Sequence, residues 1–230
     1  MARADLHMHT HFSRDSVLSP QDLVRLAEAK GLTHVAVTDH RGVDGAYAVR
    51  EAASFEVIIG QEIRTSAGEI LALFIEEPIP PKLSPGLTAA RIRSQGGVVV
   101  VPHPFDPLRP SLGHSGLAEL GSGIDAIEGY NGRTMLPGRT AQARRYAQNQ
   151  DLPVSLGSDA HSGPEVGRSW IELPDFSGPQ ELLTALRAAN YHPAARAPWW
   201  LPLSGVALLR WAVGWRPKPT ALPCGEETGS

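Results

Sequence analysis

The sequence predicts an α/β protein whose strands form a parallel sheet that is closed, or nearly closed, into a barrel. Its 230 residues suit one domain, since α/β barrels commonly reach this length undivided. Apolar residues make up 42% of the chain, which is enough to bury a real core. Apolar segments alternate with helical patterns along the chain, as expected of a succession of β–α units.

Seven short segments have the composition of strands. They are β-branched and nearly continuous in hydrophobicity, and they end at polar residues, glycine or proline, as strands covered on both faces do. The first carries His7 and His9, and the others span residues 34–40, 55–63, 69–75, 97–104, 123–130 and 152–161.

Helical patterns lie between these strands. Residues 19–31 begin with Ser-Pro, a capping residue followed by a first-turn proline, continue with an apolar stripe and end at glycine. Residues 84–97 begin with Ser-Pro and end at Gly-Gly in the same way. Residues 137–150 and 177–190 are further helix candidates, the second with leucines at helical spacing.

We expect one domain over residues 1–197 and a tryptophan-rich segment with a disordered tail over residues 198–230. Residues 199–215 contain four of the five tryptophans, and their apolar run is short for a membrane span and broken by Pro202 and Arg210. Basic residues beside tryptophans also occur in helices that lie on a membrane surface. We favour a terminal helix that covers an open part of the barrel over membrane-surface contact.

Charge and cysteine content exclude several classes of protein. The net charge of −3 argues against stable DNA binding, which relies on many unpaired basic side chains. Cys224 is the only cysteine, so a disulfide framework and a thiolate metal site are both excluded. The N-terminus lacks a basic and then apolar signal segment, so we expect a cytoplasmic protein.

Histidines and acidic residues recur where the predicted strands end. The carboxyl ends of parallel strands share one face of a barrel, and active sites are built on that face. Crowded carboxylates raise one another's pKa, and buried neutral histidines need partners, so divalent cations would satisfy both groups. The candidate metal ligands are His7, His9, Asp15, His40, Glu62, His103, Glu128, Asp159 and His161, with Asp39 as a residue that orients a neighbouring imidazole.

The motifs D-L-H-M-H-T, T-D-H, a glutamate after a G-x-E strand, H-P and G-S-D-A-H occur in this order and resemble the PHP (polymerase and histidinol phosphatase) family. The resemblance runs from about Asp5 to Pro193. It implies a distorted (β/α)7 TIM-like barrel with two or three divalent metal ions, usually zinc, manganese, iron or magnesium. Family members hydrolyse phosphate esters, from histidinol phosphate to nucleotides and nucleic-acid ends.

The resemblance also implies three metal positions. They are matched by His7, His9, Glu62 and Asp159 for the first, by the bridging Glu62 and His103 for the second, and by Asp15, His40 and His161 for the third. Some members have a further histidine near position 128, where this chain has Glu128. Glu128 is therefore either a ligand that favours harder cations such as Mn²⁺ or Mg²⁺, or the sign of a weak second position.

Clustered cations at a mixed imidazole and carboxylate site predict hydrolysis of a phosphate ester through a metal-bridged hydroxide. We expect His103, Asp159 or His161 to assist proton transfer. Arg133 and Arg168 are the candidates for holding the phosphate, and Arg14 and Arg41 are weaker ones. Arg109, in the loop 105–115, either contacts the substrate or is simply exposed.

The predicted substrate is a small phosphorylated metabolite or nucleotide. One alternative is an exonuclease-like phosphodiesterase for short nucleic acids, although the sequence lacks a basic groove interleaved with aromatic residues. A second alternative is a non-catalytic domain that metals stabilise. A carbon–nitrogen hydrolase is disfavoured, because such sites use a lysine between the metals and all three lysines lie outside the motifs.

Overall fold

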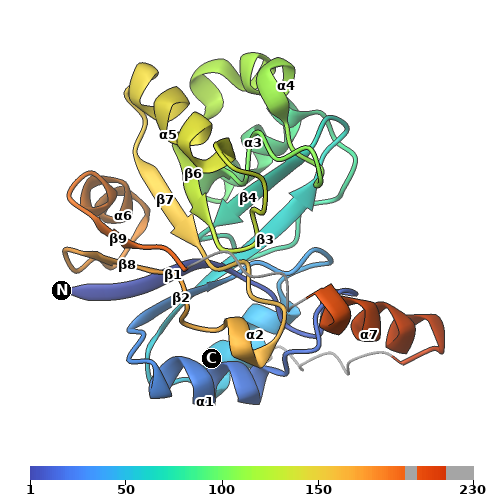
Figure 1. The fold of residues 1–230 in the computed structure, drawn as a ribbon. Helices are drawn as coiled ribbons and strands as arrows, with labels where there is room; N and C mark the ends of the chain where they lie inside the picture. Colours follow the sequence, from blue (N-terminus) through green and yellow to red (C-terminus); the bar gives the residue numbers. More distant parts are fainter. Residues whose placement is uncertain (195–200, 216–230) are drawn as a thin grey trace, which may run out of the picture.

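The computed structural model of the chain describes residues 1–194 and 201–215 (Figure 1). The predicted disordered tail and the pair Trp199 and Trp200 lie outside these residues, as does the expected domain boundary at 197. The described part contains one curved sheet, with helices packed around it.

The sheet forms a nearly closed barrel, as predicted. Its described strands have the order β7-β6-β5-β4-β3-β2-β1-β8-β9. A parallel bridge between Met8 and Ala160 brings the end of β1 beside the segment that follows β7. The strands are β1 (Ala2–Met8), β2 (His34–Val37), β3 (Glu56–Arg64), β4 (Glu69–Leu73), β5 (Val98–Val101), β6 (Ala126–Asn131), β7 (Val154–Gly157), β8 (Trp170–Leu173) and β9 (Asn190–His192).

The prediction of a wholly parallel sheet is wrong. β4 runs antiparallel to both β3 and β5, and β8 and β9 are antiparallel strands that the sequence did not predict. The connection between β3 and β4 spans only residues 65–68, and so short a loop can join antiparallel strands but not parallel ones. β8 and β9 are short and partly exposed, so they lack the continuous apolar run of a buried strand.

Five helices, α1 to α5, cover one face of the curved sheet. The predicted helices at 19–31, 84–97, 137–150 and 177–190 are present with shorter bounds, whereas α2 and α4 were not predicted. Neither of these two has a side-chain N-cap, so the usual sign of a helix start is missing. The helices are α1 (Pro20–Ala29), α2 (Asp44–Ala52), α3 (Pro85–Ser94), α4 (Gly113–Leu120), α5 (Arg139–Asn149), α6 (Pro179–Leu186) and α7 (Leu201–Ala212).

Two apolar clusters lie on the two faces of the strands. One packs α1 to α5 against the sheet and includes Leu23, Val35 and Ile92. The other includes Leu6, Ile58 and Leu182, so it joins the opposite face of the strands to α6.

The C-terminal helix does not have the predicted position. Beside the junction of β1 and β7, β8 pairs with the first residues of β1, and β9 pairs with β8. There, the hydroxyl of Tyr191 donates to the carbonyl of Val154 at 3.0 Å, and its ring stacks on Tyr130. Helix α7 extends away from the barrel at the edge of the molecule (Figure 1).

Candidate metal centre

The predicted ligands converge at the carboxyl edge of the parallel strands. The candidate ligands come from the ends of β1, β2, β5 and β7 or just after them, from the interior of β3 and β6, and, for Asp15, from the loop that follows β1. Three groups of described side chains have ligand atoms close enough to share a cation: His7, His9 and Asp159; His9, His40 and His161; and Glu62, Glu69 and His103. Most of these side chains are buried, and His40 is partly exposed.

The first metal position has the spacing of a tetrahedral site. The Nε2 atoms of His7 and His9 lie 3.0 Å apart. The Glu62 Oε2 atom lies 3.4 and 3.2 Å from these two nitrogens, and the Asp159 Oδ1 atom lies 3.6 and 3.4 Å from them. Ligands at ordinary Zn²⁺ distances of about 2.0–2.2 Å form a tetrahedron with edges of about 3.3–3.6 Å. Five of the six separations among these four atoms are therefore close to those of ligands that share one divalent cation.

Hydrogen bonds fix the orientation of these imidazoles. His7 Nδ1 donates to Glu128 Oε1 at 2.9 Å. His9 Nδ1 donates to Ser13 Oγ at 3.2 Å, because the Ser13 hydroxyl itself donates to Asp39 at 2.6 Å. Asp39 thus orients an imidazole through an intermediate hydroxyl.

The other two buried histidines of the centre, His103 and His161, have the same arrangement. His161 Nδ1 donates to the carbonyl of Asp159 at 2.8 Å, and His103 Nδ1 donates to Ser111 Oγ at 3.4 Å. All four rings therefore hold a proton on Nδ1 and direct Nε2 toward the centre, which is the orientation that metal-binding histidines need. Two Nε2 atoms at the spacing of His7 and His9 cannot both carry protons, whereas both can bind one cation.

The second position includes a ligand that the sequence analysis missed. Glu62 Oε1 lies 3.0 Å from His103 Nε2, and Glu69 Oε2 lies 3.8 Å from the same nitrogen. Glu69 is the first residue of β4, whereas the metal ligands predicted from the sequence stand where predicted strands end. Because β4 is antiparallel to its neighbours β3 and β5, its first residue lies at the edge where those two strands have their carboxyl ends.

Glu128 lies behind His7 rather than beside the second position. One of its oxygens accepts from the His7 ring, and the other accepts from the backbone N–H of His103 and from Asn131 Nδ2, both at 2.9 Å. These contacts are those of a carboxylate that orients a ligand. At the second metal position, the carboxylate beside His103 and Glu62 is therefore that of Glu69 and not that of Glu128, which the sequence analysis had considered for this position.

The third position lies at the rim. Asp15 Oδ2 is 3.6 Å from His40 Nε2 and 3.3 Å from His161 Nε2. The side chains of Asp15 and His40 are about one-third exposed, at 33% and 29%. Exposure decreases from this position toward the first, so the centre opens to solvent beside Asp15.

The pKa values indicate an excess of negative charge. Burial, together with the charge of Glu62, raises the pKa of Glu69 to about 8. Burial lowers the pKa of His40, but its hydrogen bond to Asp15 and the charge of Glu62 raise that pKa to about 10. Burial lowers the pKa of His161 to about 4. Protons therefore balance the carboxylates when no cation does so.

Two candidate ligands have a backbone conformation that side chains rarely adopt. His103 has a φ of 29° and Asp159 has a φ of 56°. Such conformations cost about 1–3 kcal/mol each and concentrate at functional sites. The same edge excludes a side chain at Gly157, whose Cβ would lie 2.2 Å from the Cβ of His7.

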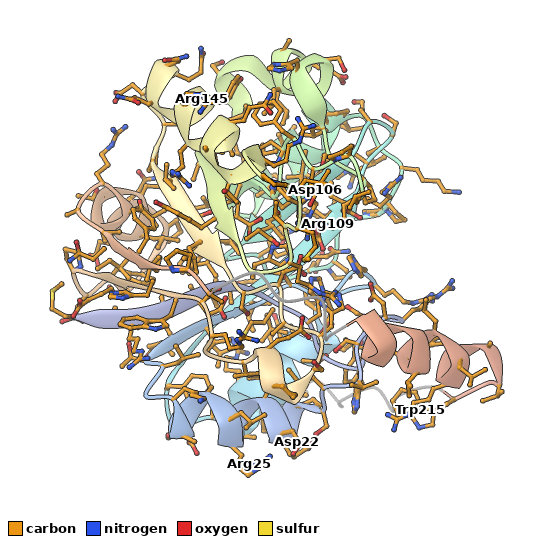
Figure 2. All side chains as sticks on the ribbon, viewed as in Figure 1. Asp22, Arg25, Asp106, Arg109, Arg145 and Trp215 are labelled. Atoms are coloured by element: carbon orange, nitrogen blue, oxygen red, sulfur yellow. The ribbon has the colours of Figure 1, made fainter. Side chains whose placement is uncertain are left out.

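An arginine that was a weak candidate lies inside the site. Arg109 donates to Asp159, and its second terminal nitrogen lies 2.9 Å from both Asn131 Oδ1 and Thr134 Oγ1. In Figure 2 it lies beside Asp106 near the middle of the molecule, and the two side chains are 3.3 Å apart. The segment 104–112 folds inward and brings Arg109 to the metal ligands.

The other candidate arginines have different positions. Arg133 Nε pairs with Glu165 at 3.1 Å, and the charge of Arg133 contributes to the low pKa of His161. Arg168 is exposed. Arg14 and Arg41 lie against the ring of Trp211 on α7.

Comparison with known proteins identifies matches along most of the chain. Residues 5–107 match the model of the PHP domain, and residues 138–191 match that of the PHP-associated domain. An uncharacterized protein of Methanocaldococcus jannaschii is 40% identical over 142 residues, covering 56% of this chain and 81% of its own. A second uncharacterized protein of that organism is 32% identical over 196 residues, covering 80% of this chain and 79% of its own.

Solved structures share the fold at low sequence identity. A candidate metal-dependent phosphoesterase from Bifidobacterium adolescentis has a TM-score of 0.61 at 20% identity, covering 80% of this chain and 95% of its own. PsfC from Pseudomonas syringae has a TM-score of 0.65 at 18% identity, covering 93% and 100%. The lesion-specific endonuclease Q of Pyrococcus furiosus has a TM-score of 0.62 at 17% identity, covering 83% and 57%.

Proposed function

The chain belongs to the PHP family, and on that premise we propose that it hydrolyses the phosphate ester of a small metabolite or nucleotide at a centre of two or three divalent cations. The observation that carries this proposal is the set of four ligand atoms from His7, His9, Glu62 and Asp159, since five of their six separations are close to the edge of a tetrahedral site. Cations held there would supply Lewis acidity toward a water molecule and toward phosphoryl oxygens.

The side chains of the chain supply the remaining functions. Arg109 donates to the candidate ligand Asp159, so its guanidinium lies beside the place where a phosphoryl group would meet the first metal position. Planar guanidinium groups bind phosphate through two N–H groups at once, which suits Arg109 to hold that group. Arg133 is a secondary candidate. Burial alone would raise the pKa of Asp159, but attraction to the charges of His7 and Arg109 lowers that pKa well below its ordinary value. Asp159 is therefore suited to bind a cation, and proton transfer falls to His103 or His161.

A small substrate is favoured over a nucleic acid by the net charge of −3, since strand binding relies on basic surface. The fold shared with endonuclease Q, which is described with a duplex substrate, keeps a phosphodiesterase as the second candidate. A non-catalytic domain stabilised by metals is the third.

The test is hydrolysis by one purified sample, with and without added Mn²⁺, of an aryl phosphate, a panel of nucleotides and sugar phosphates, and a short oligonucleotide. We expect metal-dependent release of phosphate from monoesters. Cleavage of the oligonucleotide alone would establish the second candidate. A protein that binds metal and cleaves none of these substrates would contradict the proposal.

Arg109 can be tested in the same assay. Arg109→Lys keeps the charge but loses the two-pronged geometry, and Arg109→Gln loses both. We expect KM to rise in Arg109→Lys and to rise further in Arg109→Gln, because an interaction with phosphate is lost. Unchanged kinetics in Arg109→Gln would exclude this contact.

A further inference from the structure

Helix α7 has an apolar face that the described protein does not cover. Val206, Leu209 and Val213 follow the i, i+3, i+7 spacing of one helix face and are 46%, 64% and 75% exposed. Leu208 and Trp215 are also exposed. Five of the eight large apolar side chains that are exposed among the described residues therefore lie between residues 206 and 215.

The opposite face attaches α7 to the rim of the metal centre. Ala207 and Trp211 are buried, and the guanidinium carbons of Arg14 and Arg41 lie 5.6 and 5.1 Å from the ring centre of Trp211. Both arginines are next in sequence to a candidate ligand of the third metal position. Arg14 precedes Asp15, and Arg41 follows His40. The ring of Trp215 lies 5.2 Å from that of His11 in the same loop.

The charges described at or beside α7 are positive, and three arginines carry them. Arg210 lies on α7 itself, and Arg14 and Arg41 are exposed beside it. An apolar helix face bordered by arginine and tryptophan is the pattern of a helix that lies in the interface of an anionic bilayer. Among the described residues, no helix has the length and apolarity that crossing a bilayer requires.

We propose that α7, with Arg14, Arg41 and Arg210, binds the surface of a bilayer that contains anionic phospholipids. A second copy of the chain is a less suitable occupant, because a two-fold interface through this face would bring like charges together. Since α7 contacts the loops of Asp15 and His40, attachment holds the metal centre close to the bilayer. The inference is independent of which phosphate ester the centre hydrolyses.

The test is flotation of the purified full-length protein with vesicles of phosphatidylcholine alone or mixed with phosphatidylglycerol. We expect binding only to the mixed vesicles and weaker binding at high salt. The double variant Leu209→Glu and Val213→Glu should weaken binding at least about tenfold, because it removes two apolar contacts. Arg210→Gln should weaken it by about fivefold, the effect of one charge near an anionic surface.

Leu87→Glu is the matched control, since Leu87 is 47% exposed on α3 and lies outside the patch. It should bind vesicles like the unmodified protein. Circular dichroism and hydrolysis of a soluble substrate should be the same in all these variants. The proposal is overturned if the unmodified protein binds neither kind of vesicle, if the double variant still binds, or if Leu87→Glu weakens binding equally. A dimer in solution that the double variant dissociates, without vesicle binding, would assign the face to a second copy.

Discussion

The carboxyl edge of the barrel and helix α7 are neighbours, yet they differ in what they bury and what they expose. The edge buries carboxylates such as Glu62, Glu69 and Asp159 around inward-facing imidazoles. Burial and the charge of Glu62 raise the pKa of Glu69, and the hydrogen bond to Asp15 and the charge of Glu62 raise the pKa of His40. Helix α7 exposes apolar side chains bordered by arginine. The first arrangement favours a divalent cation and the second an anionic interface. Both features indicate ligands, and the sign of the local charge indicates which kind.

The largest effect is expected from breaking the first metal position. Asp159→Asn keeps the size of the side chain, and asparagine tolerates the φ of 56° at this position. Loss of one charged ligand removes several kcal/mol of transition-state stabilisation, so we expect kcat/KM to fall at least about a hundredfold. Asp22→Asn is the control, because Asp22 is exposed on α1, far from the centre in Figure 2. Equal losses in both variants would refute the assignment of Asp159.

The next largest effect is expected from a substitution that crowds the side chain of His7 at the first metal position. In Gly157→Ala the new methyl group would lie 2.2 Å from His7 Cβ and 2.6 Å from Glu128 Oε1. We expect a loss of about 1–3 kcal/mol in the free energy of unfolding and weaker metal binding. Gly86→Ala has open space and serves as the control. Denaturant titration measures both variants, and a Gly157→Ala protein as stable as Gly86→Ala would contradict this packing.

A smaller effect should follow from changing the carboxylate behind His7. In Glu128→Gln one amide oxygen still accepts from the His7 ring, but the amide nitrogen faces two other N–H donors, those of His103 and Asn131. We expect metal affinity to fall by about 10–100-fold, the usual effect of changing a group that orients a ligand. Metal titration measures this change. Complete loss of one metal would instead make Glu128 a direct ligand.

The smallest expected effect is that of pH on the metal-free protein. The pKa of His40 is raised from 6.5 to about 10, so its contribution to stability is complete below pH 6.5 and is lost as pH rises toward 10. The pKa of Glu69 is raised from 4.5 to about 8, so the folded state loses stability as pH rises from 4.5 to about 8, a window that overlaps that of His40 above pH 6.5. In a chelator, Tm should therefore fall between about pH 7 and about pH 9.

Added metal should reverse this trend, because cation binding displaces protons and strengthens as pH rises. A Tm in chelator that increases over this interval would show that the carboxylates and imidazoles of the centre are not coupled as described. The comparison of the two samples needs only thermal unfolding at matched salt.

Much of the site was predictable, because its residues stand at the ends of recognisable strands. His103 and Asp159 come one or two residues after apolar strands and His7 lies near the end of the first strand, so the shared edge of parallel strands brings them together. Glu69 was missed because its strand is antiparallel, and the direction of β4 depends on a short loop that was not considered. An apolar pattern predicts a strand but not its direction in the sheet, and here the direction follows from the length of the loop at residues 65–68.

Two other features depended on tertiary contacts. The inward course of the segment carrying Arg109 is set by Asp106, Asn131 and Thr134, which are far apart in sequence or outside any motif. The position of α7 was wrongly predicted because β8 and β9, which pair beside the junction of β1 and β7, have weak strand patterns. With those strands unrecognised, the terminal helix was the remaining element available to close the barrel.

The most direct test of the central claim is the divalent metal content of the freshly purified protein and of His7→Ala, measured by elemental analysis. We predict two or three ions per chain in the unmodified protein and at least one fewer in His7→Ala, with the same circular dichroism spectrum. Equal metal content in the two proteins, or no metal in either after reconstitution with Zn²⁺ or Mn²⁺, would contradict a metal centre built on His7.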